Sequence, residues 1–284
     1  MKIGLFIPTY NAGRAFNKVL NSIDSSIENS GIVIRKIIID TFSDDDTVEK
    51  ARKHGFESFN IFKRDFTHGE VRRRAVGYLN ECDYIIFMTQ DVILHENSIK
   101  EIVEFIDSEE NMLVAYGRQV PDLNKSTIFE QRARKFNYPE KSKIKSKKDI
   151  DYLGIKTAFS SDAFAIYRRK LLLNIGSFPS NIKFCEDEYV AAKAILNNFF
   201  VGYCSTAIVT HSNHMNLKQQ YKRYKNIGDF HKQNPWIQKQ FGSNESEGMR
   251  LMFSEWHYLI TIKKIYLIPE SLFNFILKYI AYKI

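Results

Sequence analysis

The sequence predicts an α/β protein with a mixed central sheet, a Rossmann-like nucleotide-binding half and a helical C-terminal extension. Two observations favour this fold class. Several apolar runs of strand length each stop at a polar or acidic residue, and a polar segment typical of a helix start follows them. Runs that are apolar throughout indicate strands buried on both faces, as in a parallel sheet. Their alternation with helical patterns over the first hundred or so residues favours right-handed βαβ units.

Three strands are expected to deliver polar residues to one edge of this sheet. The first, Lys2–Ile7, breaks at Pro8-Thr9-Tyr10-Asn11, the second, residues 36–39, ends at Asp40, and the third, residues 84–91, ends on an aspartate. Ligands of open α/β sheets lie beyond the carboxyl ends of the strands. We therefore expect a binding crevice at this edge.

Two common nucleotide-binding fingerprints are missing from the chain. No G-x-G-x-x-G follows the first strand, and no G-x-x-x-x-G-K-[ST] occurs anywhere. Both motifs use glycine-rich turns to bring backbone N–H groups close to phosphates. Dinucleotide-binding and P-loop functions thereby lose their main support.

Three consecutive carboxylates stand out in Phe184-Cys185-Glu186-Asp187-Glu188. A carboxylate that faces inward at such a place is partly desolvated, so its pKa rises and it can accept a proton from a hydroxyl group. The same residues would also suit the acidic first turn of a helix that runs to about Asn198. The residues alone leave both interpretations open.

Four segments resemble, in order and spacing, the family-two glycosyltransferases of the GT-A fold. The segments are Phe6-Ile7-Pro8-Thr9-Tyr10-Asn11, Ile39-Asp40-Thr41-Phe42-Ser43-Asp44-Asp45-Asp46-Thr47, Thr89-Gln90-Asp91 and Glu186-Asp187. The resemblance covers about the first 215 residues. It implies that the enzyme transfers a sugar from a nucleotide-sugar donor.

Further segments are similar to the bacterial rhamnosyltransferase branch and extend the match to roughly Gly248. They are Phe66-Thr67-His68-Gly69 with Arg72, Ala115-Tyr116-Gly117-Arg118-Gln119-Val120-Pro121, Phe136-Asn137-Tyr138-Pro139, Leu153-Gly154-Ile155-Lys156-Thr157, and His211-Ser212 with Lys222-Arg223-Tyr224. This branch uses dTDP-L-rhamnose. The resemblance therefore implies a nucleotide-activated deoxyhexose as donor and a glycan or lipid-linked acceptor in bacterial surface polysaccharide synthesis.

The family resemblance places the catalytic base at Asp187, with Glu186 beside it. A single displacement by an activated hydroxyl would invert the anomeric centre. Residues expected to bind the substrates, with Arg72 near the diphosphate, are Pro8, Thr9, Tyr10, Asp40, Asp45, Arg72, Gln90 and Glu186.

The departing diphosphate needs a divalent cation or a cationic clamp. Asp91 and His211 match the family's metal positions, and Mg²⁺ or Mn²⁺ suits a carboxylate together with phosphate oxygens. Thr89 occupies the place of the first acid of the family's commoner D-x-D motif. As a residue at a strand end, His211 also has an ordinary structural interpretation.

Two alternative functions remain at this stage. The enzyme could use another sugar nucleotide, such as a UDP-hexose, or the chain could be a noncatalytic sugar-binding homologue. The presence of Asp187 and Asp91 speaks against the noncatalytic alternative. Nucleic acid is not expected as a partner despite the net charge of +8, because no zinc-finger spacing, RNP1 motif or long basic helix occurs.

The 284 residues are expected to form a GT-A domain over residues 1–215, with a nucleotide-binding half (1–120) and an acceptor-binding half (121–215), followed by a helical extension (216–284). Three cysteines without a recognisable spacing, and an N-terminus that starts directly with a strand pattern, favour a cytoplasmic location. A basic segment from Arg132 to Lys148 indicates a solvated loop.

The last helix carries apolar residues at helical spacing, namely Leu272, Phe273, Ile276, Tyr279 and Ile280. Pro269, Glu270 and Lys278 interrupt it, and it is too short to span a membrane. Contact with the inner face of the cell membrane, packing on the protein's own core and a homo-oligomer interface all remain open.

Overall fold

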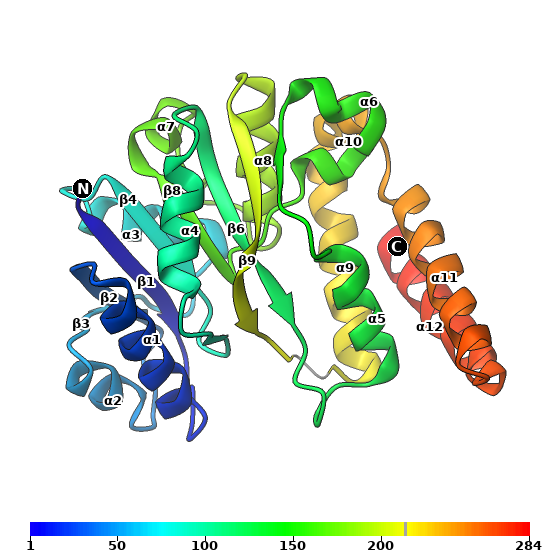
Figure 1. Ribbon diagram of the computed structural model, residues 1–284, viewed down its shortest axis with the longest axis horizontal. Helices are drawn as coiled ribbons and strands as arrows, with labels where there is room; N and C mark the ends of the chain where they lie inside the picture. The colour runs from blue at the N-terminus through cyan, green and yellow to red at the C-terminus, as the bar shows by residue number, and fades with distance from the viewer. Residues whose placement is uncertain (213–214) are drawn as a thin grey trace.

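A computed structural model of the protein describes residues 1–212 and 215–284. Its centre is a sheet of order β3-β2-β1-β4-β8-β6-β9-β5, with β7 paired to β9 (Figure 1). The strands are β1 (Ile3–Thr9), β2 (Ile34–Asp40), β3 (Glu57–Asn60), β4 (Tyr84–Met88), β5 (Ile93–Leu94), β6 (Met112–Val120), β7 (Lys143–Lys145), β8 (Phe164–Arg168) and β9 (Phe200–Thr210).

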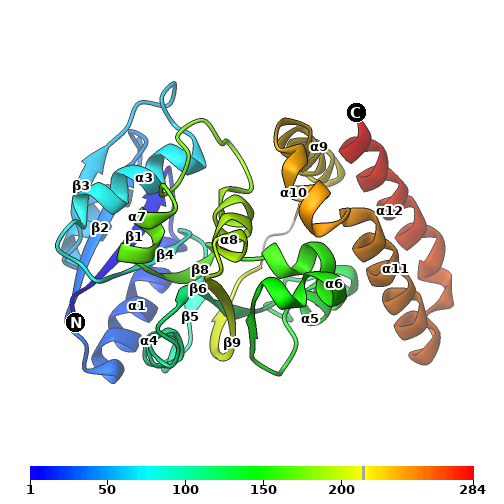
Figure 2. The same cartoon turned by 90° about the horizontal axis from the view of Figure 1, so that it is seen from above.

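The helices cover both faces of the sheet and form the C-terminal part (Figures 1 and 2). They are α1 (Phe16–Ser30), α2 (Thr47–Lys53), α3 (His68–Tyr78), α4 (Ser98–Asp107), α5 (Ile128–Asn137), α6 (Ile150–Leu153), α7 (Arg169–Asn174), α8 (Glu186–Leu196), α9 (Leu217–Gln233), α10 (Pro235–Phe241), α11 (Asn244–Thr261) and α12 (Ile268–Lys283). The mixed α/β architecture with a helical extension confirms the predicted fold class.

The first four strands are parallel and their side chains alternate between two cores. Phe6 of β1 packs in one core with α3 and α8, whereas its neighbours Leu5 and Ile7 pack in the other with α1 and α4. Both faces of each strand are thus buried, which is why these strands are apolar throughout.

Two predicted strand ends are wrong. The third strand, expected to run to Asp91, ends at Met88. The first strand was expected to break at Pro8, but β1 continues through Pro8 to Thr9 and pairs with β2 over its whole length. The ladder between β1 and β4 extends only to Phe6 opposite Phe87. A proline beyond that point removes no hydrogen bond from the β4 side, so the strand tolerates it.

The second half of the sheet is mixed. Strand β8 is antiparallel to β4 and β6, while β6 and β9 are parallel. The basic segment expected as a loop instead forms the end of α5 and the short strand β7. Lys145 in this segment is buried. Its ammonium group donates to the carbonyl oxygens of Lys156 and Phe159 and lies over the ring of Tyr116, and these contacts replace its hydration.

The C-terminal helices stand beside the sheet (Figure 2). Helix α12 packs along α9, where the backbone carbonyl of Tyr282 closely approaches Gly228; a Cβ at Gly228 would lie 2.1 Å from that oxygen. Among the described residues, no helix is long and apolar enough to cross a membrane. The division of the chain near residue 215 into an α/β domain and a helical extension stays a prediction.

Candidate active site

The ends of β1 and β2 are locked together by a buried carboxylate. The hydroxyl of Thr9 donates to Asp40 Oδ1 at 2.7 Å, and the backbone N–H of Ser43 donates to Asp40 Oδ2 at 2.7 Å. Asp40 is only 1% exposed. Both carboxylate oxygens of Asp40 thus already accept hydrogen bonds within the protein. Asp40 would act on a nucleotide indirectly, by fixing the positions of Thr9 and Ser43.

Gln90 connects the loop after β1 to the loop after β4. Its side-chain oxygen accepts from the backbone N–H of Tyr10 at 2.9 Å, and its side-chain nitrogen donates to the carbonyl of Tyr10 at 3.1 Å. The ring of Tyr10 stays 44% exposed beside this amide pair, with the ammonium of Lys63 5.3 Å from its centroid. An exposed aromatic ring with a nearby cation is suited to binding a nucleotide.

Asp45 fastens the loop after β1 to the start of α2. It accepts from the backbone N–H groups of Gly13 at 2.9 Å and Thr47 at 3.1 Å. The hydroxyl of Thr47 donates to it as well, and this bond lowers the pKa of Asp45. Asp45 thus shapes the same loop on which Tyr10 lies.

Asp91 and His211 meet across the sheet edge, with Asp91 Oδ2 3.2 Å from His211 Nε2. Gln119 Oε1 lies 2.8 Å from Nδ1 of the same ring. Because an amide oxygen can only accept, Nδ1 carries a proton, and a neutral ring then points its Nε2 lone pair toward Asp91. Two ligand atoms facing each other in this way fit a divalent cation.

The contact with His211 also sets the charge state of Asp91. Burial raises the pKa of Asp91, but the hydrogen bond and the charge of His211 outweigh it and lower the pKa to about 2. No cluster of three or more potential metal ligands occurs among the described residues. A bound Mg²⁺ or Mn²⁺ would therefore take further ligands from water and from the donor's phosphates.

Asp187 lies on the first turn of α8, where two backbone N–H groups hold its carboxylate. Glu188 N–H donates to Oδ1 at 2.8 Å, and Asp162 N–H lies 3.3 Å from Oδ2. Cys185 precedes this turn with φ at 62°, a left-handed conformation that non-glycine residues rarely adopt. The side chain of Asp187 remains partly exposed. A partly solvated, oriented carboxylate at a helix start can serve as a general base.

Arg72 lies in a different environment from the one expected near a diphosphate. Its side chain is 3% exposed, its Nε is 2.6 Å from Asp162 Oδ2 and its Nη1 is 2.9 Å from Glu186 Oε1. Tyr167 also donates to Asp162 at 2.6 Å. The guanidinium of Arg72 is thus already paired with Asp162 and Glu186. In this structure it holds α3, the loop before β8 and α8 together.

The two carboxyl groups around Arg72 bind protons more tightly than usual. Burial raises the pKa of Glu186 to about 8 and that of Asp162 to about 6, in both cases against the charge of Arg72. The negative charge of Asp187 adds to both increases. Glu186 is 5% exposed and supports the turn that carries Asp187 rather than facing the crevice.

Sequence reasoning missed the role of the loop before β8. Ser161 accepts from the side-chain nitrogen of Gln119 at 2.7 Å, and the next residue, Asp162, contacts both Asp187 and Arg72. The loop thus connects the Asp91–His211 pair to the base. A polar triplet, Ser160-Ser161-Asp162, just before an apolar strand was the available signal.

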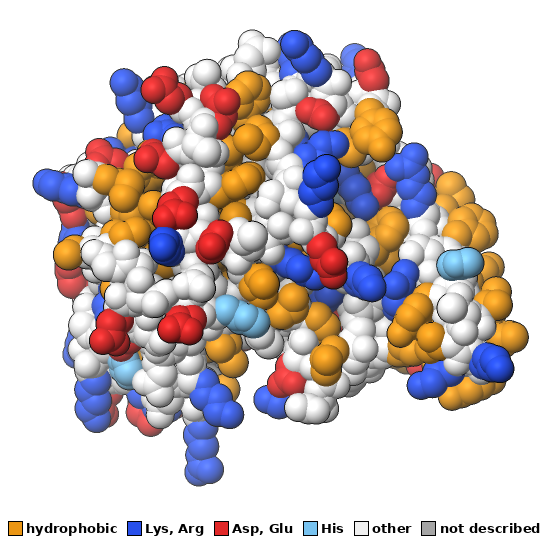
Figure 3. All heavy atoms as spheres, in the orientation of Figure 1, with side chains coloured by type: hydrophobic (Ala, Val, Ile, Leu, Met, Phe, Trp, Pro, Cys, Tyr) orange, Lys and Arg blue, Asp and Glu red, His pale blue; other side chains and the backbone are white. Residues whose placement is uncertain are grey.

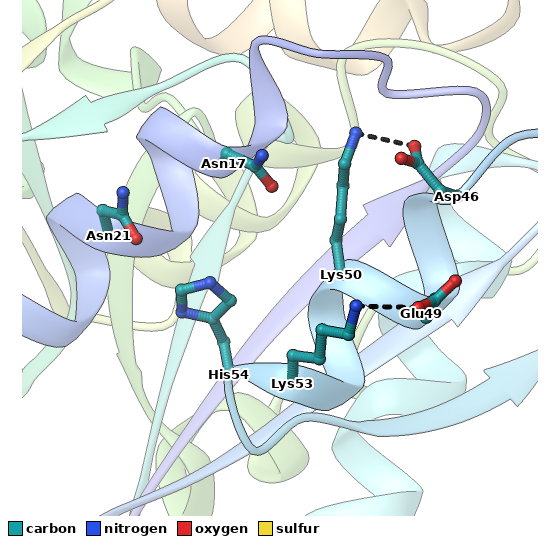
Figure 4. Close-up of a pocket in the computed structure, with 7 residues that line it drawn as sticks. All are labelled: Asn17, Asn21, Asp46, Glu49, Lys50, Lys53 and His54. Carbon is teal, nitrogen blue, oxygen red and sulfur yellow. Dashed lines mark ion pairs between the residues drawn. The ribbon is translucent and has the colours of Figure 1, made fainter.

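A hollow between α1 and α2 lies apart from these residues (Figure 4). Its two lysines are paired within the protein, Lys50 with Asp46 at 2.6 Å and Lys53 with Glu49 at 2.7 Å. The strand-end residues, not this hollow, form the candidate active site.

Comparison with known proteins agrees with this geometry. The family model described as glycosyl transferase family 2 matches residues 5–176. The chain belongs to glycosyl transferase family 2. It is 39% identical over its whole length to the O-antigen chain rhamnosyltransferase RfbN of Salmonella typhimurium, covering 89% of that protein. It is also 37% identical to WbaN, a rhamnosyltransferase of Salmonella anatum, over 99% of this chain and 88% of the relative.

Solved structures of glycosyltransferases share the fold. A mannosyltransferase from Pyrobaculum calidifontis, in complex with GDP-Man and Mn²⁺, aligns over 99% of this chain and 85% of its own with a TM-score of 0.69 and 12% identity. TarS of Staphylococcus aureus with UDP-GlcNAc aligns over 80% of this chain and 66% of its own, with a TM-score of 0.57 and 20% identity. The predicted family and GT-A fold are thus confirmed, and the protein is a glycosyltransferase.

Proposed function

We propose that this glycosyltransferase moves L-rhamnose from dTDP-L-rhamnose onto a glycan or lipid-linked acceptor in the synthesis of a bacterial surface polysaccharide, with inversion at the anomeric carbon. The observation that carries the proposal is the full-length similarity to two O-antigen rhamnosyltransferases, combined with an oriented carboxylate at Asp187. The donor, the acceptor and the residue roles all belong to this proposal.

Asp187 accepts the proton of the acceptor hydroxyl as that oxygen attacks the anomeric carbon. The bond between this carbon and the donor's diphosphate breaks, and its electron pair leaves with the nucleotide. A β-linked donor then yields an α-L-rhamnoside. Loss of a positioned base typically slows a reaction on the order of a hundredfold or more.

The remaining site residues bind and orient the donor. Thr9, Asp40 and Asp45 hold the loops that would surround the nucleotide, while Tyr10 offers its exposed ring. A divalent cation between Asp91 and His211 would offset the charge of the leaving diphosphate.

A binding screen tests the donor. Thermal unfolding is measured with dTDP, UDP and GDP, each with and without Mn²⁺, because a ligand that binds only the folded state raises its stability. We expect the largest increase with dTDP. A larger increase with UDP would replace the rhamnose donor by a UDP-hexose, and no increase with any nucleotide would favour a noncatalytic role.

We further propose that the apolar face of α11 and α12 lies on an anionic membrane surface. Of the 21 large hydrophobic side chains that are exposed in the described part of the chain, eleven belong to residues 244–284. Figure 3 shows hydrophobic side chains gathered along the right-hand edge, where α11 and α12 lie. Phe273, Ile276 and Tyr279 are 48–54% exposed, so this stripe is not packed on the protein's own core. Lys263 and Lys264 at the turn between the helices make no ion pair with any described residue.

Exposed apolar side chains next to unpaired lysines suit an anionic lipid interface, where buried area and electrostatic attraction add. The double variant Phe273→Glu/Ile276→Glu should lose binding to anionic liposomes. The control Leu123→Glu, at a position 71% exposed outside these helices, should not. Unchanged liposome binding would contradict the proposal, and a loss of dimers instead would identify the face as an interface between two copies.

A further inference from the structure

Arg134 is a cation that lies near the candidate site and makes no ion pair with a described residue. It lies on α5 and is partly buried. Its guanidinium donates to Gln119 Oε1, and its Nη2 lies 3.4 Å from His211 Nδ1. Neither partner carries a negative charge.

Two arginines of this chain, Arg35 and Arg72, are each paired with two carboxylates, whereas Arg132 and Arg169 donate to neutral acceptors. Arg134 makes no ion pair with any residue that the structure describes. A partly desolvated guanidinium is stabilised by an anion, so the arrangement indicates that the anion arrives with a ligand.

The surroundings of Arg134 indicate which part of the reaction it faces. His211, which it approaches, forms the candidate cation pair with Asp91. Its guanidinium also lies 5.9 Å from the ring centroid of Tyr138. Burial raises the pKa of Tyr138, the charge of Arg134 opposes the increase, and the charge of Asp187 adds to it. Arg134 therefore lies beside the cation pair, and both its charge and that of Asp187 act on Tyr138.

We propose that Arg134 binds the diphosphate of the sugar-nucleotide donor and stabilises the negative charge that this diphosphate gains when the bond to the sugar breaks. This inference rests on the proposed function. Arg134, rather than Arg72 as the sequence predicts, would then contact the diphosphate. A planar guanidinium can form two parallel hydrogen bonds to phosphate oxygens, which a lysine cannot reproduce.

A diphosphate could come from the donor or from a lipid-linked acceptor. We assign the donor because Arg134 approaches His211, which together with Asp91 would hold the donor's cation. The experiment separates the two sources by measuring nucleotide affinity apart from the acceptor's KM.

Calorimetric titration of dTDP, UDP, GDP and dTMP, each with Mn²⁺ and with chelator, compares the parent with three variants. Arg134→Gln removes the charge, and Arg134→Lys keeps the charge but not the fork of donors. Lys135→Gln is the matched control, because Lys135 is exposed on the same helix. Melting temperatures confirm that each variant is folded.

Arg134→Gln should weaken binding of the preferred nucleoside diphosphate about ten- to hundredfold, the usual effect of losing hydrogen bonds to a charged group. Its effect on dTMP should be smaller, Arg134→Lys should be intermediate, and Lys135→Gln should match the parent. Equal diphosphate affinity in the parent and Arg134→Gln overturns the inference, as does a change confined to the acceptor's KM. If UDP replaces dTDP as the ligand that depends on Arg134, the donor proposal fails while the role of Arg134 stands; if the parent binds no nucleotide, both fail.

Discussion

Replacing Arg72 by methionine should destabilise the protein strongly. The substitution keeps most of the apolar stem but removes the guanidinium from between Asp162 and Glu186, whose side chains are 2% and 7% exposed. Removing one partner of a buried ion pair typically costs about 3–5 kcal/mol, because the carboxyl groups that it contacted stay buried without their cation. For a chain of this size the melting temperature should fall on the order of 10 °C.

The next residue supplies a matched control. Arg73 is 52% exposed and pairs with Glu70 at 2.9 Å, so Arg73→Met should cost less than about 1 kcal/mol. Urea unfolding of both variants, followed by circular dichroism, measures the difference in free energy of unfolding. If Arg72→Met and Arg73→Met are equally stable, the buried cluster does not hold α3 to α8 as described.

Two other predictions concern the metal and the pH. Asp91→Ala should weaken nucleotide binding chiefly when Mn²⁺ is present, since a ligand to the cation matters only when the cation is bound; equal weakening with chelator would contradict a metal role for Asp91. The pKa of Glu186, raised from 4.5 to about 8, means that the folded state retains a proton that the unfolded state loses, so stability should fall as the pH increases between these values. Glu186→Gln should flatten this decrease in urea unfolding measured at several pH values, and an unchanged slope would contradict the raised pKa.

Local sequence pattern was sufficient to predict the strands that end at the site. The apolar runs before Asp40 and Asp91 could be recognised because strands buried on both faces need such runs. Asp187 could be placed on the first turn of a helix because acidic residues favour that position. The end of β1 was mispredicted, because whether Pro8 breaks a strand depends on how far the neighbouring strand extends.

The contacts that orient the site could not be predicted in the same way. Arg72 and Asp162 are 90 residues apart in sequence, and three adjacent arginines gave no sign that only Arg72 would turn inward. The support of His211 by Gln119 likewise joins residues 92 positions apart. Such pairs arise when helices pack on the sheet, a step that local propensity does not specify.

The most direct test of the account is the activity of Asp187→Asn, which keeps the size of the side chain but removes the base. Rhamnosyl transfer from dTDP-L-rhamnose to an acceptor glycan is measured together with the affinity for dTDP. We predict that the turnover falls on the order of a hundredfold or more while dTDP binds as it does to the parent protein. Transfer at the parental rate would contradict the assignment of Asp187 as the base and the mechanism that depends on it.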